Sequence, residues 1–138
     1  GHCSCGKQEC GSAGKHPMCT NGFKDATTDE QKIKVWWEEF PCANIGIATG
    51  SVSGIIVLDV DPRNGGEKSL DELIKLHGNL PDSYSVYTGG KGKHIYFKYP
   101  EIKLGCRTGM LDGLDLKSDG GYVVAPPSVH FSDSEYSI

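Results

Sequence analysis

A short apolar segment that ends in two acidic residues constrains the fold of this chain more than any other feature. Residues Ile55 to Val60 are apolar apart from Asp59, and Asp61 follows directly, before Pro62. An apolar run of this length, bounded by proline, favours a β-strand, in which successive side chains point to opposite faces. Asp59 and Asp61 are therefore expected on the same face, at the end of the strand.

Two carboxylates held this close repel each other unless something opposes their charge. A divalent cation does so, and carboxylate oxygens are the ligands that Mg²⁺ and Mn²⁺ prefer. The alternative is structural, because aspartate before proline commonly starts a turn and both acids would then be solvated. The pair predicts a strand that ends either in a metal site or in a solvated turn.

The length and composition indicate one compact unit. A chain of 138 residues is enough for one hydrophobic core, so a single domain over residues 1–138 is expected. No apolar run approaches the roughly 20 residues that span a membrane, so no membrane partner is expected. The chain does not open with a charged and apolar leader, which predicts a cytoplasmic location.

The charge is distributed unevenly. A formal net charge of −4 argues against a globally basic nucleic-acid binder. Between Thr88 and Lys117 the balance is reversed, because six basic residues stand against three acidic ones. A positive surface beside an acidic metal site suits a polyanionic ligand, and the alternative is a mixed, solvated surface.

Three of the six cysteines crowd the start of the chain, and a histidine follows them. Thiolates and an imidazole at short spacing, separated by glycine, fit a closed tetrahedral zinc site better than a disulfide knot. The expected ligands, in a zinc-binding segment at residues 2–19, are Cys3, Cys5, Cys10 and His16. His2 and Cys19 are the spare ligands. Cys42 and Cys106 are expected to be ordinary buried thiols.

Hydrophobic periodicity predicts two helices. Thr28-Asp-Glu-Gln31 has the form of a capping box and opens a helix that Pro41 ends. Its apolar stripe, expected in the core, is Ile33, Trp36, Trp37 and Phe40. A second helix is expected after Gly65-Gly66, and its common face carries Leu70, Leu73, Ile74 and His77.

The remaining segments alternate as strands do. Strands are expected at residues 44–48, 55–60, 84–88, 94–98, 114–116 and 122–125, with a glycine-rich hairpin between Thr88 and His94. Pro126-Pro127 is expected to be a rigid strand end and His130 a surface residue. The order of elements predicts an α+β fold with helices on a mostly antiparallel sheet.

Several of these motifs together resemble a known family. Asp59-Val-Asp61, the glycine-rich turn ending in His94, and the segment 113–130 occur in the order seen in bifunctional DNA primase/polymerase domains of the archaeo-eukaryotic primase superfamily. The segments 44–50 and 14–17 also resemble this family, which is common in phages, plasmids and mobile elements. The resemblance covers nearly the whole chain.

The resemblance implies roles for particular residues. It implies catalytic, metal-binding carboxylates at Asp59, Asp61 and Asp115. It places His94 on the phosphates of the incoming nucleotide, with Lys93 beside it and Lys117 as a further phosphate contact. It also implies an RNA-recognition-like sheet packed with helices. Lys91 departs from the family, which usually has glycine there.

The implied activity is template-dependent nucleotidyl transfer, in which a 3′-hydroxyl attacks the α-phosphate of a nucleoside triphosphate. Two Mg²⁺ or Mn²⁺ ions would stabilise the attacking and leaving oxygens, and no protein nucleophile is needed. The implied partners are a single-stranded DNA template and dNTP or NTP. The chain resembles a fragment of a larger bacterial, archaeal, phage or plasmid replication protein, with a helicase as a further domain or partner.

Two other functions stay open. One is a repair polymerase that extends DNA ends and cannot prime. The other is a non-catalytic, zinc-bearing DNA-binding module that recruits a replicative helicase. The three carboxylates weigh against the second, because concentrated negative charge facing a phosphate backbone does not serve binding.

Overall fold

The structure is a computed structural model that describes residues 3–138, so His2, the spare zinc ligand at the start of segment 2–19, lies outside the described residues. Within these residues the chain forms two α-helices, two 3₁₀ helices and seven strands. Their order is η1 (Gly22–Asp25), α1 (Glu30–Glu39), β1 (Ile45–Ala48), β2 (Ile55–Val60), η2 (Pro62–Asn64), α2 (Gly66–His77), β3 (Ser85–Tyr87), β4 (Lys93–Lys98), β5 (Arg107–Leu111), β6 (Leu114–Lys117) and β7 (Tyr122–Ala125).

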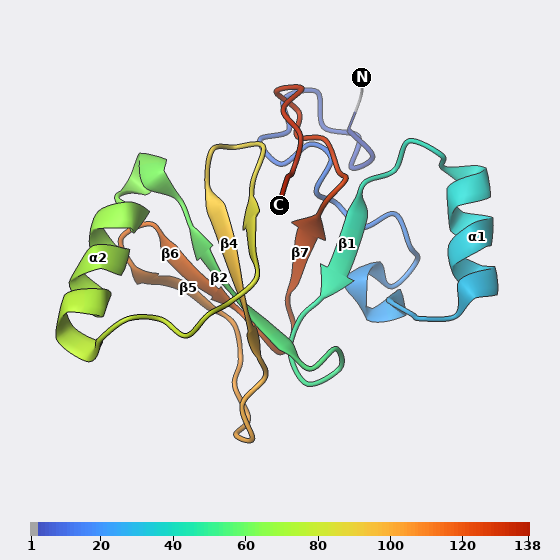
Figure 1. Cartoon of the computed structure of the whole chain (residues 1–138). Helices are drawn as coiled ribbons and strands as arrows, with labels where there is room; N and C mark the ends of the chain where they lie inside the picture. Colours follow the sequence, from blue (N-terminus) through green and yellow to red (C-terminus); the bar gives the residue numbers. More distant parts are fainter. Residues whose placement is uncertain (1–2) are drawn as a thin grey trace.

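The strands form two antiparallel sheets. The larger has the order β3-β4-β2-β6-β5, and β1 pairs with β7 in the smaller. Figure 1 shows α2 on one side of the large sheet and the β1–β7 pair on the other. The predicted α+β class with antiparallel strands is confirmed, although the strands divide between two sheets.

The apolar segment Ile55–Val60 forms β2, the central strand of the large sheet, and its apolar side chains are buried or half-buried. Leu58 and Val60 belong to a buried cluster with Ile95 and Leu114, and Leu70 and Leu73 of α2 pack against this cluster. Alternation then directs Asp59 to the opposite face of the sheet. A second buried cluster of Val86, Val124 and Tyr136 joins β3, β7 and the C-terminal segment.

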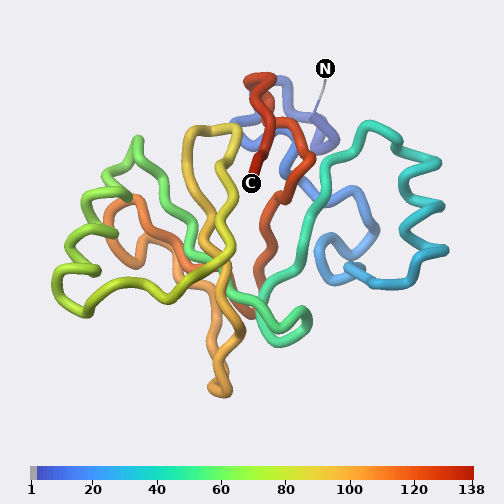
Figure 2. Tube along the Cα trace, viewed as in Figure 1, coloured from blue at the N-terminus to red at the C-terminus, as the bar shows by residue number. Residues whose placement is uncertain are grey.

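The segment before η1 lies against the smaller sheet and the C-terminal segment. The side-chain amide of Asn44 donates to the carbonyl oxygen of Gly14 at 3.0 Å and to that of Val129 at 2.7 Å. Figure 2 shows these two distant parts of the chain side by side. These hydrogen bonds place residues 3–19, called the cysteine segment from here on, beside β7.

The first helix differs from its prediction in two ways. Its N-cap is Asp29 rather than Thr28, and the Asp29 carboxylate accepts from the N–H groups of Gln31 and Lys32. The apolar stripe is not core, because no residue of α1 is buried and Phe40 is 36% exposed. The helix stands at the margin of the molecule, beyond the two-stranded sheet, where no described layer covers it (Figure 1).

Two cysteines and one strand differ from the sequence predictions. Cys42 and Cys106 are exposed rather than buried, because both lie in connecting segments at the surface. Strand β5 was not predicted, since all five of its residues are exposed and their order, Arg-Thr-Gly-Met-Leu, does not alternate. Within residues 3–138, neither helix has the length and apolar character needed to cross a membrane.

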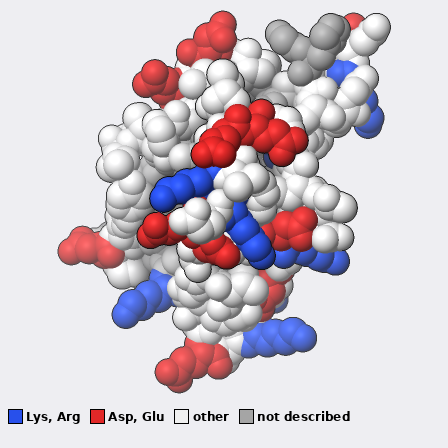
Figure 3. Space-filling model, turned by 90° about the vertical axis from the view of Figure 1, so that its right-hand side faces the viewer, with Lys and Arg blue, Asp and Glu red and all other residues white. Residues whose placement is uncertain are grey.

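The surface on the α1 side carries acidic and basic side chains interspersed with each other (Figure 3). A continuous stripe of lysine and arginine, which would follow a nucleic-acid backbone, is not seen on this face. The side chains with candidate chemistry gather elsewhere, between the large sheet and the N-terminal cysteine segment.

Candidate active site and metal centre

The centre of the large sheet brings three predicted site residues into one row. Asp59 on β2 is the register partner of His94 on β4 and also of Asp115 on β6. Directly opposed residues in antiparallel strands point to the same face, with their Cβ atoms about 5 Å apart. Asp59, His94 and Asp115 therefore lie side by side on the face opposite α2.

The first pair in this row is Asp59 and His94. The Nε2 atom of His94 lies 3.6 Å from Oδ1 of Asp59, and the His94 side chain is 8% exposed. Burial lowers the pKa of His94, the Asp59 charge opposes this, and the Lys15 and Lys117 charges add to the lowering. The imidazole is therefore largely neutral at pH 7. Its buried Nδ1 has no hydrogen-bond partner within the described part of the chain.

The carboxylate of Asp115 is held at the other end of the row. The Lys117 ammonium lies 2.8 Å from Oδ2, and the backbone N–H of Gly109 donates to Oδ1 at 2.7 Å. Burial acts to raise the pKa of Asp115, but these two contacts outweigh it, and the pKa lies below its ordinary value. Asp115 is therefore ionised and partly neutralised by Lys117.

Asp61 lies beyond the end of β2 and has a different environment. Its side chain caps η2, and its two oxygens are bridged by the Arg63 guanidinium, with Nε 3.0 Å from Oδ1 and Nη2 3.1 Å from Oδ2. Asn64 donates a further hydrogen bond at 2.9 Å. The Arg63 hydrogen bonds are the main reason that the pKa of Asp61 is lowered. Arg63 was not predicted as a site residue, although Asp-Pro-Arg-Asn has the form of a capped helical turn.

Lys93 is placed apart from this row. It precedes His94 on β4, so its side chain points to the other face of the sheet. Its ammonium lies 5.8 Å from the ring centroid of Tyr87. It lines a different cavity, of about 390 Å³, with Glu67 and Asp71 of α2 and with Lys91. The structure therefore separates Lys93 from the face that carries His94.

The four predicted zinc ligands come together near the N-terminus. Within residues 3–138, one group of three or more His, Cys, Asp or Glu side chains has all of its ligand atoms within 4.8 Å of one another: Cys3, Cys5, Cys10 and His16. Sγ of Cys10 lies 3.2 Å from Nε2 of His16. A backbone hydrogen bond from Cys5 is the largest of the causes that lower the pKa of Cys3 to about 7, which favours the thiolate. Cys19 is not in the group. Three sulfur donors and one nitrogen donor at this spacing fit a tetrahedral zinc ion.

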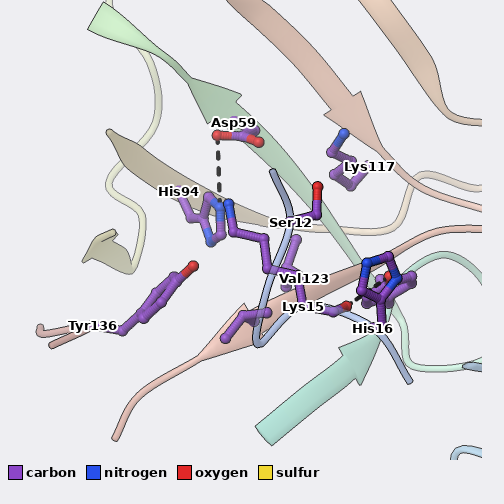
Figure 4. A pocket seen from close by; sticks show the side chains of 10 residues that line it. Ser12, Lys15, His16, Asp59, His94, Lys117, Val123 and Tyr136 are labelled. Carbon is purple, nitrogen blue, oxygen red and sulfur yellow. Dashed lines mark hydrogen bonds and ion pairs between the residues drawn. The ribbon is translucent and has the colours of Figure 1, made fainter. Parts of the chain in front are cut away.

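A cavity of about 240 Å³ lies between this cysteine segment and the row on the sheet (Figure 4). The sheet contributes Asp59, His94 and Lys117 to its lining. The other lining residues come from the cysteine segment, from β7 and from the C-terminal segment: Ser12, Lys15, His16, Tyr122, Val123, Val124 and Tyr136. Lys15 was noted only as part of the segment 14–17 and Tyr136 was not noted at all, because only the fold brings both residues to this place.

His130 is buried and not a surface residue as predicted. It is 6% exposed, and its Nδ1 lies 2.8 Å from the Ser132 hydroxyl. The C-terminal segment folds back here, with the N–H of His130 donating to the Ser134 carbonyl at 2.8 Å, and the ring packs against Gly89 of the glycine-rich hairpin. Burial lowers the pKa of His130, and the charges of Lys15 and Arg63 lower it further.

The lowered pKa of His130 predicts that acid destabilises the fold. Because the unfolded chain binds this proton more readily than the folded protein, the free energy of unfolding should fall as the pH drops below about 6.5. Urea unfolding at pH 7.5 and 5.5 should show a larger loss for the wild type than for His130→Gln. His77→Gln, which alters an exposed histidine at the end of α2, should keep the wild-type loss. Equal losses in the wild type and His130→Gln would contradict the prediction.

Comparison with known proteins identifies the family. No curated protein matches the chain. The sequence model described as bifunctional DNA primase/polymerase, N-terminal, matches residues 9–138. The match includes the whole of the row on the sheet, and of the four cysteine-group ligands it includes Cys10 and His16. The resemblance seen in the ordered motifs is confirmed: the chain belongs to the bifunctional DNA primase/polymerase N-terminal family.

Proposed function

We propose that this chain is a template-dependent nucleotidyltransferase that uses divalent metal ions to add nucleotides from nucleoside triphosphates to a DNA strand. Membership of the family implies primase/polymerase activity of the nucleotidyl-transfer type, with DNA and nucleotides as substrates and a divalent metal. The observation that carries the proposed mechanism is the row of Asp59, His94 and Asp115 on one face of the sheet, where Asp59 and His94 border a cavity.

The carboxylates of the row suit an oxygen-coordinated cation. Asp59 and Asp115 are paired across neighbouring strands, and their side chains are 32% and 28% exposed, so both reach solvent at the same face. Mg²⁺ or Mn²⁺ bound there would stabilise charge on the attacking and leaving oxygens of the phosphoryl group. We include Asp61 as the third ligand. Because Arg63 holds both of its oxygens, Asp61 joins the set only when the guanidinium turns away.

The other residues of the site oppose the charge of the triphosphate. His94 is a neutral imidazole beside Asp59 and can donate one hydrogen bond to a phosphate oxygen. Lys117 reaches the same cavity from β6 and balances negative charge. Lys93 points to the other face, so we leave it outside the proposed nucleotide contacts.

The large sheet and the domain as a whole also fit this function. We propose that the large sheet, with α2 on one face and the candidate site on the other, corresponds to the RNA-recognition-like sheet of primase/polymerase domains. We also propose that residues 1–138 act as one catalytic domain of a larger replication protein, working with a helicase. A cysteine segment that holds a zinc ion would complete this domain.

Incorporation assays test the function directly. The protein is incubated with labelled dNTP or NTP, Mg²⁺ or Mn²⁺, and either an unprimed single-stranded DNA or a primed template. Products from the unprimed template support a primase/polymerase, and products from the primed template alone support a repair polymerase. DNA binding without incorporation under all conditions would contradict the proposal and favour a non-catalytic DNA-binding module.

The proposed role of His94 predicts a selective loss. His94→Ala should weaken nucleotide binding by roughly tenfold or more, because a hydrogen bond to a charged phosphate contributes about 1.5–3 kcal/mol. The melting temperature should fall by a few degrees at most, because the ring lies beside Tyr96 and Tyr136 on one side but borders the cavity on the other. Calorimetric titration with dATP checks the affinity, with His77→Ala as the control. An unchanged affinity together with a melting temperature lowered by many degrees would show a core role instead.

The cysteine group predicts one structural zinc ion per chain. Elemental analysis of freshly purified protein should find zinc in the wild type and little in Cys10→Ser. Cys19→Ser should keep its zinc, because Cys19 lies outside the group of four ligands. Zinc-free wild-type protein, prepared without chelators, would refute the zinc site. Loss of zinc from Cys19→Ser would instead correct the ligand set.

A further inference from the structure

The cysteine segment forms one wall of the cavity at the candidate site. Three of its residues, Ser12, Lys15 and His16, line the same space as Asp59 and His94. In Figure 4 the Lys15 side chain runs from the segment across the cavity and ends next to His94. One side chain of the cysteine segment thus extends into the cavity toward the row on the sheet.

The backbone around Lys15 is fixed on both sides. The Tyr122 hydroxyl on β7 donates to the carbonyl oxygen of Lys15 at 2.8 Å, and the Tyr122 ring stacks on Phe23 with centroids 5.8 Å apart. Asn44 holds the preceding carbonyl, that of Gly14, at 3.0 Å. The following residue, His16, belongs to the cysteine group. The backbone of Lys15 is therefore held in place by β7 on one side and by the four predicted zinc ligands on the other.

The charge of Lys15 is available to a ligand. Among the described residues, the ammonium of Lys117 is paired with Asp115 and the guanidinium of Arg63 with Asp61, whereas Lys15 forms no ion pair. Its charge nevertheless lowers the pKa of both His94 and His130, so it acts on the two buried histidines around the cavity. Lys15 and Lys117 both line this cavity, and Asp59 is its only acidic lining residue, so an anionic ligand bound there would meet two lysines and, once a cation is bound at Asp59, little opposing charge.

We infer that Lys15 binds the phosphate groups of a nucleoside triphosphate in this cavity, and that the metal-binding cysteine segment holds Lys15 in place. The inference rests on the proposed function, which supplies the triphosphate. Its consequence is that the cysteine group contributes to nucleotide affinity as well as to the stability of the segment.

The first test measures binding of dATP and of inorganic triphosphate, each with Mg²⁺, by calorimetric titration. Lys15→Ala should bind both probes roughly tenfold to a hundredfold more weakly than the wild type. Lys15→Arg should recover most of the affinity, because it keeps the charge. Lys7→Ala is the matched control, since Lys7 lies on the same segment, is exposed and does not line the cavity. Zinc content and melting temperature should stay at their wild-type values in all three variants.

The second test is a double-mutant cycle between Lys15→Ala and Cys10→Ser. If the cysteine group acts through Lys15, Cys10→Ser should weaken dATP binding in the wild-type background and have little further effect in Lys15→Ala. Additive losses would show that the two residues act independently and would overturn the link between metal and lysine.

Two results would overturn the lysine assignment itself: unchanged affinity of Lys15→Ala for both probes, or an affinity loss that appears only together with loss of zinc. These outcomes are distinct from failure of the proposed function. A wild type that incorporates no nucleotide refutes the function, while binding of inorganic triphosphate still reports on Lys15 without catalysis.

Discussion

Replacing Asp59 by asparagine is expected to remove nucleotide transfer while leaving the fold intact. Asparagine keeps the shape of the side chain and removes the negative charge at the centre of the row, between His94 and Asp115. Without that charge the divalent cation is held poorly, and a loss of several kcal/mol of transition-state stabilisation slows the reaction by orders of magnitude. Primed and unprimed incorporation assays measure the effect.

The matched control is Asp82→Asn, which changes an exposed aspartate in the loop before β3. It should keep the wild-type rate. Asp59→Asn should also keep the melting temperature, because the neutral His94, 3.6 Å away, is the only basic side chain that contacts the Asp59 carboxylate within the described residues, so no ion pair is lost. A folded Asp59→Asn protein with near wild-type incorporation would show that Asp59 does not hold the catalytic metal.

The sequence predicted which residues of one strand share a face better than it predicted which residues of other strands lie beside them. Alternation along one strand is a local property, and it directs Asp59 to the face opposite Leu58 and Val60, which pack toward α2. That Asp59 has His94 on one side and Asp115 on the other depends on the register of three strands. Register depends on long-range pairing, which a single sequence does not specify by its period. Only the order of motifs shared with a known family pointed to this group of residues.

Alternation also separates Lys93 from His94. Adjacent residues of a strand point to opposite faces, so Lys93 and His94 could not both reach one ligand from β4. The resemblance placed them together because they are neighbours in the motif. For strand residues, position in a motif must therefore be combined with the face on which the side chain lies.

Burial was the property least accessible from sequence. The stripe of α1 has the period of a core helix, yet α1 has no buried residue, because a period states which residues share a face and not what covers it. His130 lies near the end of the chain, where exposure is the ordinary expectation. It is buried because the C-terminal segment returns against Gly89. The cysteine group was easier to predict, because short spacing and ligand type are local features.

The junction between α2 and the site carries the second large expected effect. Gly66 begins α2 and lies against Gly113, the residue before β6. Its N–H donates to the Asp61 carbonyl at 2.9 Å, and the Asp61 N–H donates to the Gly113 carbonyl at 2.8 Å. A Cβ atom on Gly66 would meet the Gly113 carbonyl oxygen and would lie 2.8 Å from both N and O of Asp61. These contacts are with backbone, which cannot turn aside as a side chain can.

Gly66→Ala should therefore lower the free energy of unfolding by about 1–3 kcal/mol or more, as overpacking of a close backbone contact does. The melting temperature should fall by several degrees, and incorporation should fall with it, because the strain displaces Asp61 and the start of β6, which carries Asp115. Urea unfolding and incorporation are measured together. Gly46→Ala is the control, since a Cβ atom there meets nothing within 4 Å. If Gly66→Ala unfolds at the wild-type urea concentration, the close approach of α2 to β6 does not constrain the site.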